Sequence, residues 1–182
     1  MDIHEIINRI YRMPEASADK VVKHLSKVTY PKGYHILEAG KTETNIFFIE
    51  KGIARAYIPV DGKEGSTIVS LKSYVNNQQG YESMELMENS VLYLLKRKDL
   101  HELFKEDIHI ANWGRKFAES EFLQTEERLI SLLFTTASER YMKLIQNNPE
   151  LLQRIPLECL ASYLGITPVS LSRIRAKLKR VL

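Results

Sequence analysis

The stretch LASYLGITPVSLSRIRAKLKR, which spans residues 160–180, constrains the fold more than any other part of this chain. Ala161 is followed four positions later by Gly165, and the pair Thr167-Pro168 comes just after it. A glycine can take the positive φ that ends a helix in a tight turn. Threonine caps the free N–H groups at a helix start, and proline fits the first turn. The stretch therefore predicts two short helices joined by a tight turn.

The apolar residues of this region recur at helical spacing, on the sides where the two helices would face each other. Ala161 has to be small because the second helix crosses close to it. Burial of the whole set would give the two helices one shared core. We predict that Leu160, Leu164, Ile166, Leu171 and Ile174 form this shared core, and that Leu157, Ala161 and Leu178 also face inward.

The opposite face of the second helix is predicted to be exposed and basic. Residues 159–182 carry five basic side chains and no acidic one, in a chain whose net charge is only +3. Two short helices with an exposed basic second helix are typical of the helix-turn-helix, whose second helix enters the major groove of DNA. The candidate DNA-binding residues are Thr167, Val169, Ser170, Arg173, Lys177 and Arg180.

These candidates have different expected roles. Thr167 and Ser170 lie beside the helix N-terminus, where they can donate hydrogen bonds to phosphate. Arg173 lies one turn further on the same face and can make a bidentate contact with guanine. Lys177 and Arg180 contact phosphates or only solvent. A purely structural helix pair is the alternative interpretation of the same pattern.

Residues 28 to about 95 have a different sequence pattern. Short β-rich runs such as NIFFI and SVLYLL alternate with turn sequences such as PKG, EAGK and DG. Several short strands at this spacing indicate an antiparallel sandwich or barrel. We therefore predict a β domain that ends shortly before residue 100.

A long helix is predicted to follow the β domain, because residues 98–134 contain no proline and their apolar residues recur with helical spacing. The apolar stripe of so long a helix has to be covered, either by a twofold partner helix or by the chain's own β domain. The predicted dimer-interface residues are Trp113, Phe117, Phe122 and Leu129. A capping box at Thr136–Glu139 then starts another helix. We divide the chain into residues 1–107, 108–135 and 136–182.

Composition and motifs argue against several classes of protein. The chain has an ordinary globular balance of 44% hydrophobic and 27% charged residues. It contains no nucleophile-elbow, zinc-protease or P-loop motif, so we expect no enzyme. Cys159 is the only cysteine and the five histidines show no haem pattern, so we expect no metal and no cofactor. No apolar run approaches the roughly 20 residues of a membrane span, so we expect no membrane partner and a cytoplasmic protein.

Two segments resemble the Crp/Fnr family of transcription regulators. KGYHILEAGKTETNIFFIEKGIARAYI resembles the opening of that family's β-roll, and ASERYMKLIQNNPELLQRIPLECLASYLGITPVSLSRIRAKL is similar to its winged-helix end, especially in Bacteroidetes-type members. The resemblance implies an α+β fold with a cyclic-nucleotide-binding-like jelly roll, a long dimerisation helix and a C-terminal helix-turn-helix. It also implies a homodimer on inverted-repeat double-stranded DNA, with a small-molecule effector whose identity the sequence leaves open.

The sequence also departs from the family pattern. Cyclic-nucleotide binders carry a Gly-Glu pair and a downstream arginine that hold the ligand, but this chain has Gly65-Ser66 and then Gly80-Tyr81-Glu82-Ser83. We therefore expect no response to cyclic AMP. We also expect the usual return strand to be lacking after Glu64, so either the β-roll is truncated or a segment is missing there. Val169 stands where relatives often have a glutamate, and it can contact a thymine methyl group instead. The alternative function is a ligand-sensing β-roll protein that has lost DNA binding.

Overall fold

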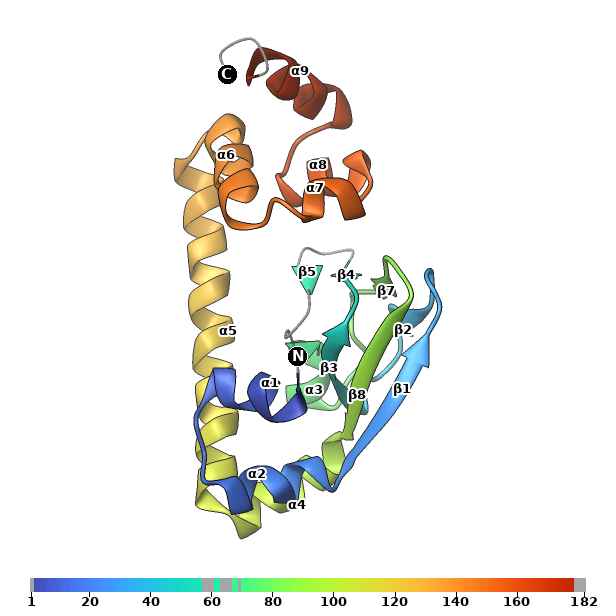
Figure 1. Cartoon of the computed structure of the whole chain (residues 1–182), viewed down its shortest axis with the longest axis vertical. Coiled ribbons are helices and arrows are strands. Elements are labelled where there is room, and N and C mark those ends of the chain that lie inside the picture. The colour runs from blue at the N-terminus through green and yellow to red at the C-terminus, as the bar shows by residue number, and fades with distance from the viewer. Residues whose placement is uncertain (1, 57–60, 63–66, 69, 179–182) are drawn as a thin grey trace. The chain divides into compact units, whose positions relative to one another are not determined.

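The structure is a computed structural model of the chain (Figure 1), and it describes residues 2–56, 61–62, 67–68 and 70–178. The chain divides into two compact units, Met1–Ser120 and Glu121–Leu182. The predicted boundaries were 107/108 and 135/136, whereas the division into compact units falls inside the long helix. Each unit is described separately below.

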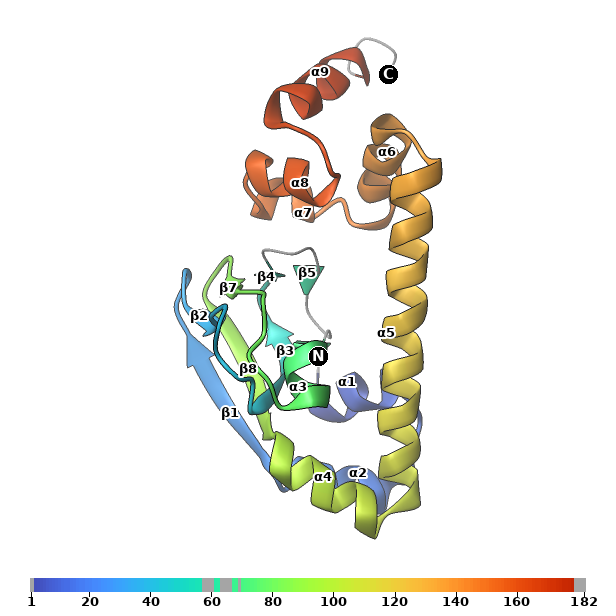
Figure 2. The same ribbon diagram turned by 180° about the vertical axis from the view of Figure 1, so that it is seen from behind.

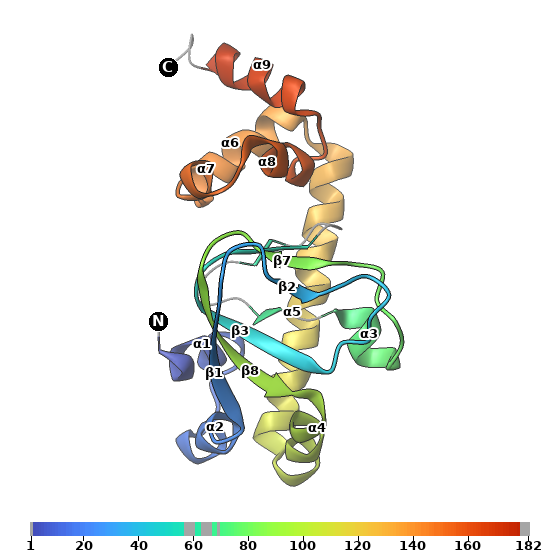
Figure 3. The same cartoon turned by 90° about the vertical axis from the view of Figure 1, so that its right-hand side faces the viewer.

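Unit 1 (Met1–Ser120) is built around two four-stranded antiparallel sheets, seen as two layers in Figure 3. The first sheet has the strand order β1-β8-β3-β6, and the second has the order β2-β7-β4-β5. The prediction of an antiparallel sandwich or barrel is thereby confirmed, and two separate sheets make it a sandwich. The strands are β1 (Leu25–Tyr30), β2 (His35–Leu37), β3 (Asn45–Lys51), β4 (Ala54–Ala56), β5 (Asp61–Gly62), β6 (Thr67–Ile68), β7 (Met84–Leu86) and β8 (Ser90–Lys96).

Strand β3 is buried on both of its faces. Alternate side chains of a strand point to opposite sides, so its run of four apolar residues supplies two cores. Ile46 and Phe48 join a core formed with the helices, while Phe47 and Ile49 join a core between the two sheets. The continuous apolar run NIFFI is therefore the sequence mark of a central strand covered on both sides.

Helices cover the outer face of the first sheet (Figure 2). Ile6 and Ile7 of the first helix are fully buried there, together with Leu100 of the fourth. The helices of this unit are α1 (Ile3–Ile10), α2 (Glu15–Val22), α3 (Leu71–Asn76), α4 (Arg97–Glu106) and the first part of α5 (Ile108–Phe134). The long helix predicted over 108–135 thus ends one residue earlier than expected.

Asp107 joins α4 to α5. Its buried carboxylate accepts hydrogen bonds from Ser17 Oγ at 3.0 Å, from Lys20 Nζ at 2.9 Å and from the His109 N–H at 3.0 Å. The hydrogen bond from Lys20 is the main reason why the pKa of Asp107 falls to about 2. Asp107 therefore anchors the start of α5 to α2.

The structure corrects part of the predicted dimer interface. Trp113 is 2% exposed, its Nε1 donates a hydrogen bond to the Ile7 carbonyl at 2.9 Å, and its ring stacks on Phe117 with centroids 5.8 Å apart. Phe48 of β3 lies against the same indole, 6.0 Å between centroids. Trp113 and Phe117 are therefore covered by their own β domain and not by a partner. Pattern alone allowed either cover, because helical spacing marks a buried face without naming its neighbour.

The segment after Glu64, where the sequence predicts a truncated or missing part of the roll, lies mostly outside the described residues. The two strands that flank it are short. Asp61–Gly62 pairs with β4 and Thr67–Ile68 pairs with β3, each at the edge of its sheet. Residues 63–66 between them, which include the predicted departure at Gly65-Ser66, are not described.

Unit 2 (Glu121–Leu182) is helical throughout its described residues, 121–178. Its first element is the second part of α5. The predicted capping box starts the next helix, since Thr136 Oγ1 accepts from the Glu139 N–H and the Glu139 carboxylate accepts from the Thr136 N–H. The further helices are α6 (Ala137–Asn147), α7 (Leu151–Arg154), α8 (Leu157–Tyr163) and α9 (Pro168–Leu178).

Candidate nucleic-acid interface

The turn between α8 and α9 has the geometry that the sequence predicts. Gly165 has a φ of +69°, which favours glycine. Its N–H donates to the Ser162 carbonyl at 3.0 Å, and the Ile166 N–H donates to the Ala161 carbonyl at 3.0 Å. This pair of hydrogen bonds is the Schellman arrangement that satisfies the last carbonyls of a helix. A Cβ at residue 165 would also lie 3.2 Å from Leu132 Cδ2, so the position is both strained and crowded for other residues.

The start of α9 is capped by Thr167. Its Oγ1 accepts a hydrogen bond from the Ser170 N–H at 3.2 Å and lies 2.9 Å from the Ser170 hydroxyl. Its carbonyl accepts the first helical hydrogen bond, from the Leu171 N–H at 3.0 Å. Pro168 therefore occupies the first helical position, where its missing N–H costs nothing. The two hydroxyls lie together at the helix N-terminus, the place where anions bind.

The two faces of the helix pair separate as predicted, although the core is less complete at its edges. Of the eight residues predicted to face inward, the structure buries Leu160, Ala161, Leu164 and Leu171. The other four are half-buried: Leu157, Ile166, Ile174 and Leu178. Each of these lies at the periphery of a pair of helices only 7 and 11 residues long, which cannot enclose every apolar residue.

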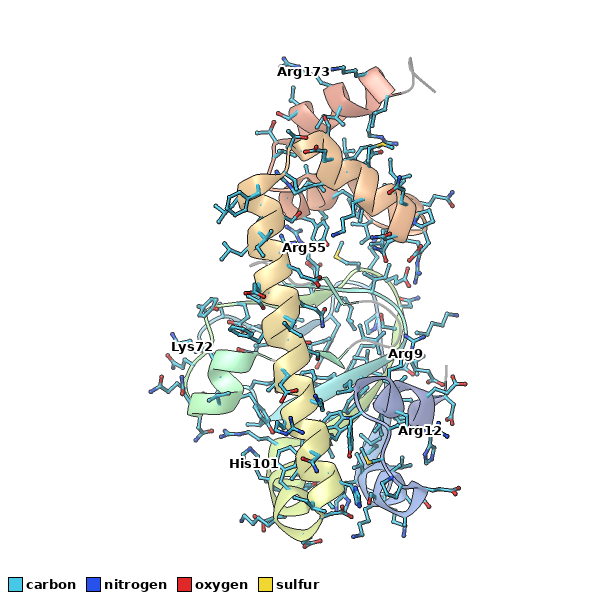
Figure 4. The ribbon with its side chains drawn as sticks, turned by 90° about the vertical axis from the view of Figure 1, so that its left-hand side faces the viewer. Arg9, Arg12, Arg55, Lys72, His101 and Arg173 are labelled. Carbon is cyan, nitrogen blue, oxygen red and sulfur yellow. The ribbon has the colours of Figure 1, made fainter. Side chains whose placement is uncertain are left out.

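The candidate DNA-binding residues form one exposed surface on α9. Thr167, Val169, Arg173 and Lys177 are exposed, and Ser170 is half-buried beside its cap. Figure 4 shows Arg173 extending outward from α9. Its guanidinium makes no hydrogen bond or ion pair with any described residue. Arg180 lies outside the described residues. We call the five described residues, Thr167, Val169, Ser170, Arg173 and Lys177, the α9 surface.

Two arginines that the sequence analysis did not single out hold the end of α8. Arg128 of α5 donates from Nη2 to the Tyr163 carbonyl at 2.9 Å, and its guanidinium lies 4.5 Å from the centre of the Tyr163 ring. Arg140 of α6 donates from Nε and Nη2 to the Leu164 carbonyl, at 3.1 and 2.9 Å. Positive charge is favourable at the C-terminal end of a helix. The two arginines thus fix the turn that leads into α9.

Arg140 also joins α6 to the end of α5. Its Nη1 donates to the Thr135 carbonyl and, at 3.4 Å, to the Ser131 carbonyl. One side chain therefore connects three helices. The only sequence signal for this role was a basic residue one turn after a helix cap, which is too common to identify it.

The second part of α5 carries an exposed apolar stripe. Phe122 and Leu129, which the sequence assigns to the dimer interface, are 70% and 55% exposed. At about 100° per residue, these two lie on one side of the helix, and Arg128 and Leu132 lie on another. The exposed apolar residues on the side of Phe122 and Leu129 are Phe122, Leu123, Leu129, Ile130, Leu133 and Phe134, and Leu132 on the other side is 38% exposed.

Glu82, which belongs to the segment compared above with the ligand-holding positions of the resembled family, is a buried acid. Glu82 is 8% exposed, and its Oε2 accepts a hydrogen bond from the Tyr81 N–H at 3.0 Å. No basic side chain among the described residues pairs with this carboxylate. A buried negative charge at this position would repel a phosphate.

Comparison with known proteins shows the fold of this chain. No protein-family model matches the sequence, and no curated protein matches it significantly. Solved structures do match. FixK2 of Bradyrhizobium japonicum is 17% identical with a TM-score of 0.70, over 86% of this chain and 85% of that one. The c-di-GMP responsive global regulator CLP of Xanthomonas campestris is 13% identical with a TM-score of 0.72, over 92% of both chains.

A third match is a protein of Eubacterium rectale described as a transcriptional regulator of the Crp/Fnr family. It is 13% identical with a TM-score of 0.72, over 92% of this chain and 84% of that one. The predicted α+β fold class is therefore confirmed, and the resemblance to the Crp/Fnr regulators is confirmed as a likeness of fold. Among the described residues, no helix has the length and apolarity that a membrane span requires.

Proposed function

We propose that this chain is a transcription regulator of the Crp/Fnr type, which binds double-stranded DNA through the α9 surface. The observation that carries the proposal is the contrast across α9. Leu171 is fully buried against α8, whereas Arg173 is exposed and makes no hydrogen bond or ion pair with a described residue. A long cationic side chain beside a capped helix N-terminus suits the edge of a guanine in the major groove.

The geometry of the α9 surface supports a different role for each of its residues. The hydroxyls of Thr167 and Ser170 lie at the helix N-terminus and support phosphate contacts. Val169 is 60% exposed and offers an apolar contact to a thymine methyl group. Lys177, two turns along the helix, supports a phosphate contact, which positions the protein without reading sequence.

The same proposal includes a homodimer on inverted-repeat DNA. The stripe that contains Phe122 and Leu129 leaves six large apolar side chains exposed on one helix, and a second copy of the same helix is a self-complementary cover. A helix-turn-helix dimer places its two recognition helices about 34 Å apart, one turn of DNA. The predicted half-sites are therefore centred about 10 base pairs apart.

Selection of bound sequences from a random DNA pool tests the proposal most directly, because its result reports half-site identity, spacing and symmetry together. We expect a motif with twofold symmetry. Binding to a random duplex should weaken with salt with a slope near −0.9 per phosphate contact. A pool that yields no enriched motif and a chain that binds no duplex at low salt would favour the alternative, a ligand-sensing β-roll protein without DNA activity.

Variants of α9 distinguish residues that contact bases from residues that contact only phosphates. Arg173→Ala should relax preference at one base pair by about 1–3 kcal/mol, whereas Lys177→Ala should weaken all duplexes alike and lower the salt slope by about 1. Lys143→Ala, an exposed lysine on α6, is the matched control and should bind as the parent does. Equal binding by the parent and the Arg173→Ala variant would show that α9 does not read bases.

Cyclic AMP is not the proposed effector. The buried carboxylate of Glu82 supports this part of the proposal, because the phosphate of a cyclic nucleotide would meet a like charge there. Calorimetric titration with cyclic AMP and with cyclic GMP should give no heat of binding. Micromolar binding of either nucleotide would contradict the role assigned to Glu82.

A further inference from the structure

We infer that a groove on unit 1, lined by Thr44, Asn45, Asn77, Lys96, Arg97, Lys98 and His101, binds a small multivalent anion. The groove has a volume of about 590 Å³, within the range of about 300–1,000 Å³ that small-molecule sites occupy. It lies where the start of β3, the end of α3 and the start of α4 meet. None of its lining residues belongs to the positions that hold a nucleotide in the resembled family. None of them belongs to the α9 surface either, so the inference is independent of the proposed DNA binding.

The charged residues that line the groove are all basic. Three consecutive basic residues, Lys96 to Lys98, line it, and no carboxylate among the described residues does. This concentration is local, since residues 1–120 contain 17 basic and 17 acidic side chains in all. The acids of α4 are placed elsewhere: Glu102 pairs with Lys105 at 2.8 Å, and Asp99 is not among the lining residues. Two or more negative charges on a ligand would be needed to balance the groove.

The three bases are also unfavourable for the helix that they begin. Lys96 is the N-cap of α4 and makes no side-chain capping hydrogen bond, and Arg97 and Lys98 occupy the first turn. A helix N-terminus carries partial positive charge, so basic side chains there destabilise the helix. Residues that break a local rule in this way are expected at functional sites.

Arg97 is held in place at the groove. Its Nη1 donates to Asn77 Oδ1 at 2.5 Å, and its guanidinium lies 5.4 Å from the centre of the Tyr74 ring. Its backbone N–H donates to the Thr44 carbonyl at 2.9 Å. The guanidinium is thus positioned by contacts within unit 1 before any ligand arrives, which reduces the ordering cost of binding.

His101 also lines the groove. It projects from α4 on the side where α3 lies (Figure 4), and its ring is 5.5 Å from the Tyr74 ring. Burial lowers the pKa of His101, and the charges of Arg97 and Lys105 lower it further, while Glu102 raises it. The positive charge of Arg97, which lines the groove, thus acts on the imidazole, and a ring N–H can donate a hydrogen bond to an anion.

Polar, uncharged groups complete the recognition chemistry. The side chains of Thr44, Asn45 and Asn77 offer a hydroxyl and two amides along one edge of the groove. Lys96 and Lys98 are exposed and make no hydrogen bond or ion pair with a described residue. This combination suits a compact organic polyanion with hydrogen-bonding groups, either a phosphorylated or a polycarboxylate metabolite.

Titration with sodium tripolyphosphate and with citrate, at constant ionic strength, tests the inference and distinguishes the two sources of charge. Binding is followed by amide chemical shifts of the full-length protein. We expect saturable shifts at Thr44, Asn45 and His101 with at least one of the two probes. Shifts confined to α9, or no saturable shift with either probe, would overturn the inference.

Lys96→Gln/Lys98→Gln is the decisive variant, and Lys72→Gln is its matched control. Lys72 is an exposed lysine on α3 that does not line the groove. The double variant should weaken probe binding at least tenfold, while the control should stay within twofold of the parent. Equal weakening by both variants would show a general charge effect and would also overturn the inference.

Two further measurements on the double variant separate loss of the anion site from unfolding and from loss of DNA binding. Because the lysines are unfavourable at the start of α4, the double variant should melt at or above the temperature of the parent, so lost binding cannot be attributed to unfolding. It should also bind duplex DNA as the parent does, since DNA binding is assigned to α9. Loss of DNA binding in the double variant would show that the groove contacts nucleic acid and not a small molecule.

Discussion

The two parts of α5 both carry apolar residues at helical spacing, yet these residues are buried in the first part and exposed in the second. In the part within unit 1, Trp113 and Phe117 are buried against α1 and β3. In the part within unit 2, Phe122 and Leu129 are 70% and 55% exposed. Periodicity thus identifies which face of a helix needs a cover, but it does not say whether the cover is the same chain or another molecule.

The sharpest test of this comparison uses one residue type on both sides of the division. Phe117 is 9% exposed and Phe122 is 70% exposed, five residues later in the same helix. Phe117→Ala should lower the free energy of unfolding by about 3–5 kcal/mol, because it leaves a cavity beside Trp113. Phe122→Ala should change it by less than about 0.5 kcal/mol at protein concentrations that keep the chain monomeric.

Urea denaturation monitored by the fluorescence of Trp113, the only tryptophan, measures the first value. Far-UV circular dichroism, which also reports the helices of unit 2, measures the second. Submicromolar protein avoids the added stability that association would give. Similar losses in the two variants would show that Phe122 is covered within its own chain.

Charge placed on the exposed stripe should abolish association and leave the fold intact. Phe122→Asp/Leu129→Asp should raise the dimer dissociation constant at least hundredfold, about 3 kcal/mol, because a partner helix would have to bury unpaired carboxylates. Sedimentation equilibrium measures the constant, and circular dichroism checks the helix content. Lys116→Asp, at an exposed position on the part of α5 in unit 1, is the control and should still dimerise. Unchanged association in the double variant would place the interface elsewhere.

The side of the second part of α5 that faces α8 is held by the cation of Arg128, whereas the first part is held by the aromatic pair Trp113 and Phe117. Arg128→Ala should destabilise unit 2 by about 2 kcal/mol, because the Tyr163 carbonyl loses a charged donor and the Tyr163 ring loses its cation. Arg128→Lys should recover only part of this, since an ammonium cannot copy the planar guanidinium. Thermal melts with a probe in unit 2 measure the effect. Full recovery of stability by Arg128→Lys would show that only the positive charge at this position matters, and not the shape of the guanidinium.

The smallest predicted effect concerns the start of α5 and depends on pH. The pKa of Asp107 is lowered to about 2, mainly by its hydrogen bond with Lys20, so the folded state binds this proton more weakly than the unfolded state does. The stability from this group is therefore complete above the ordinary pKa of about 3.9 and is lost as the pH falls through about 2. We expect it to be worth about 1 kcal/mol, since Lys20 is half exposed.

The stability of Asp107→Asn should accordingly vary less with pH between 5 and 2 than that of the parent. Urea midpoints at several pH values measure this slope. A slope equal to that of the parent would mean that the network at the start of α5 contributes nothing measurable.

Much of the helix-turn-helix was predictable from sequence because its constraints are local. The φ of Gly165, the cap made by Thr167 and the burial of Leu171 each depend on residues within a few positions. The cover of Trp113 was not predictable, because the Ile7 carbonyl that its indole binds lies 106 residues away. Arg128 and Arg140 were missed for the same reason, since an exposed-looking arginine gives no local sign of the distant carbonyl it holds.

The double-sided burial of β3 has a consequence for how unit 1 opens. Ile46, Phe47, Phe48 and Ile49 are all at most 4% exposed, and they belong to two different cores. Amide protons of this strand cannot reach water through loss of the helices alone or of the second sheet alone. They should be among the last to exchange with deuterium, and their rates should report the full unfolding free energy of the unit. A single strand thus makes the two cores cooperate as one folding unit.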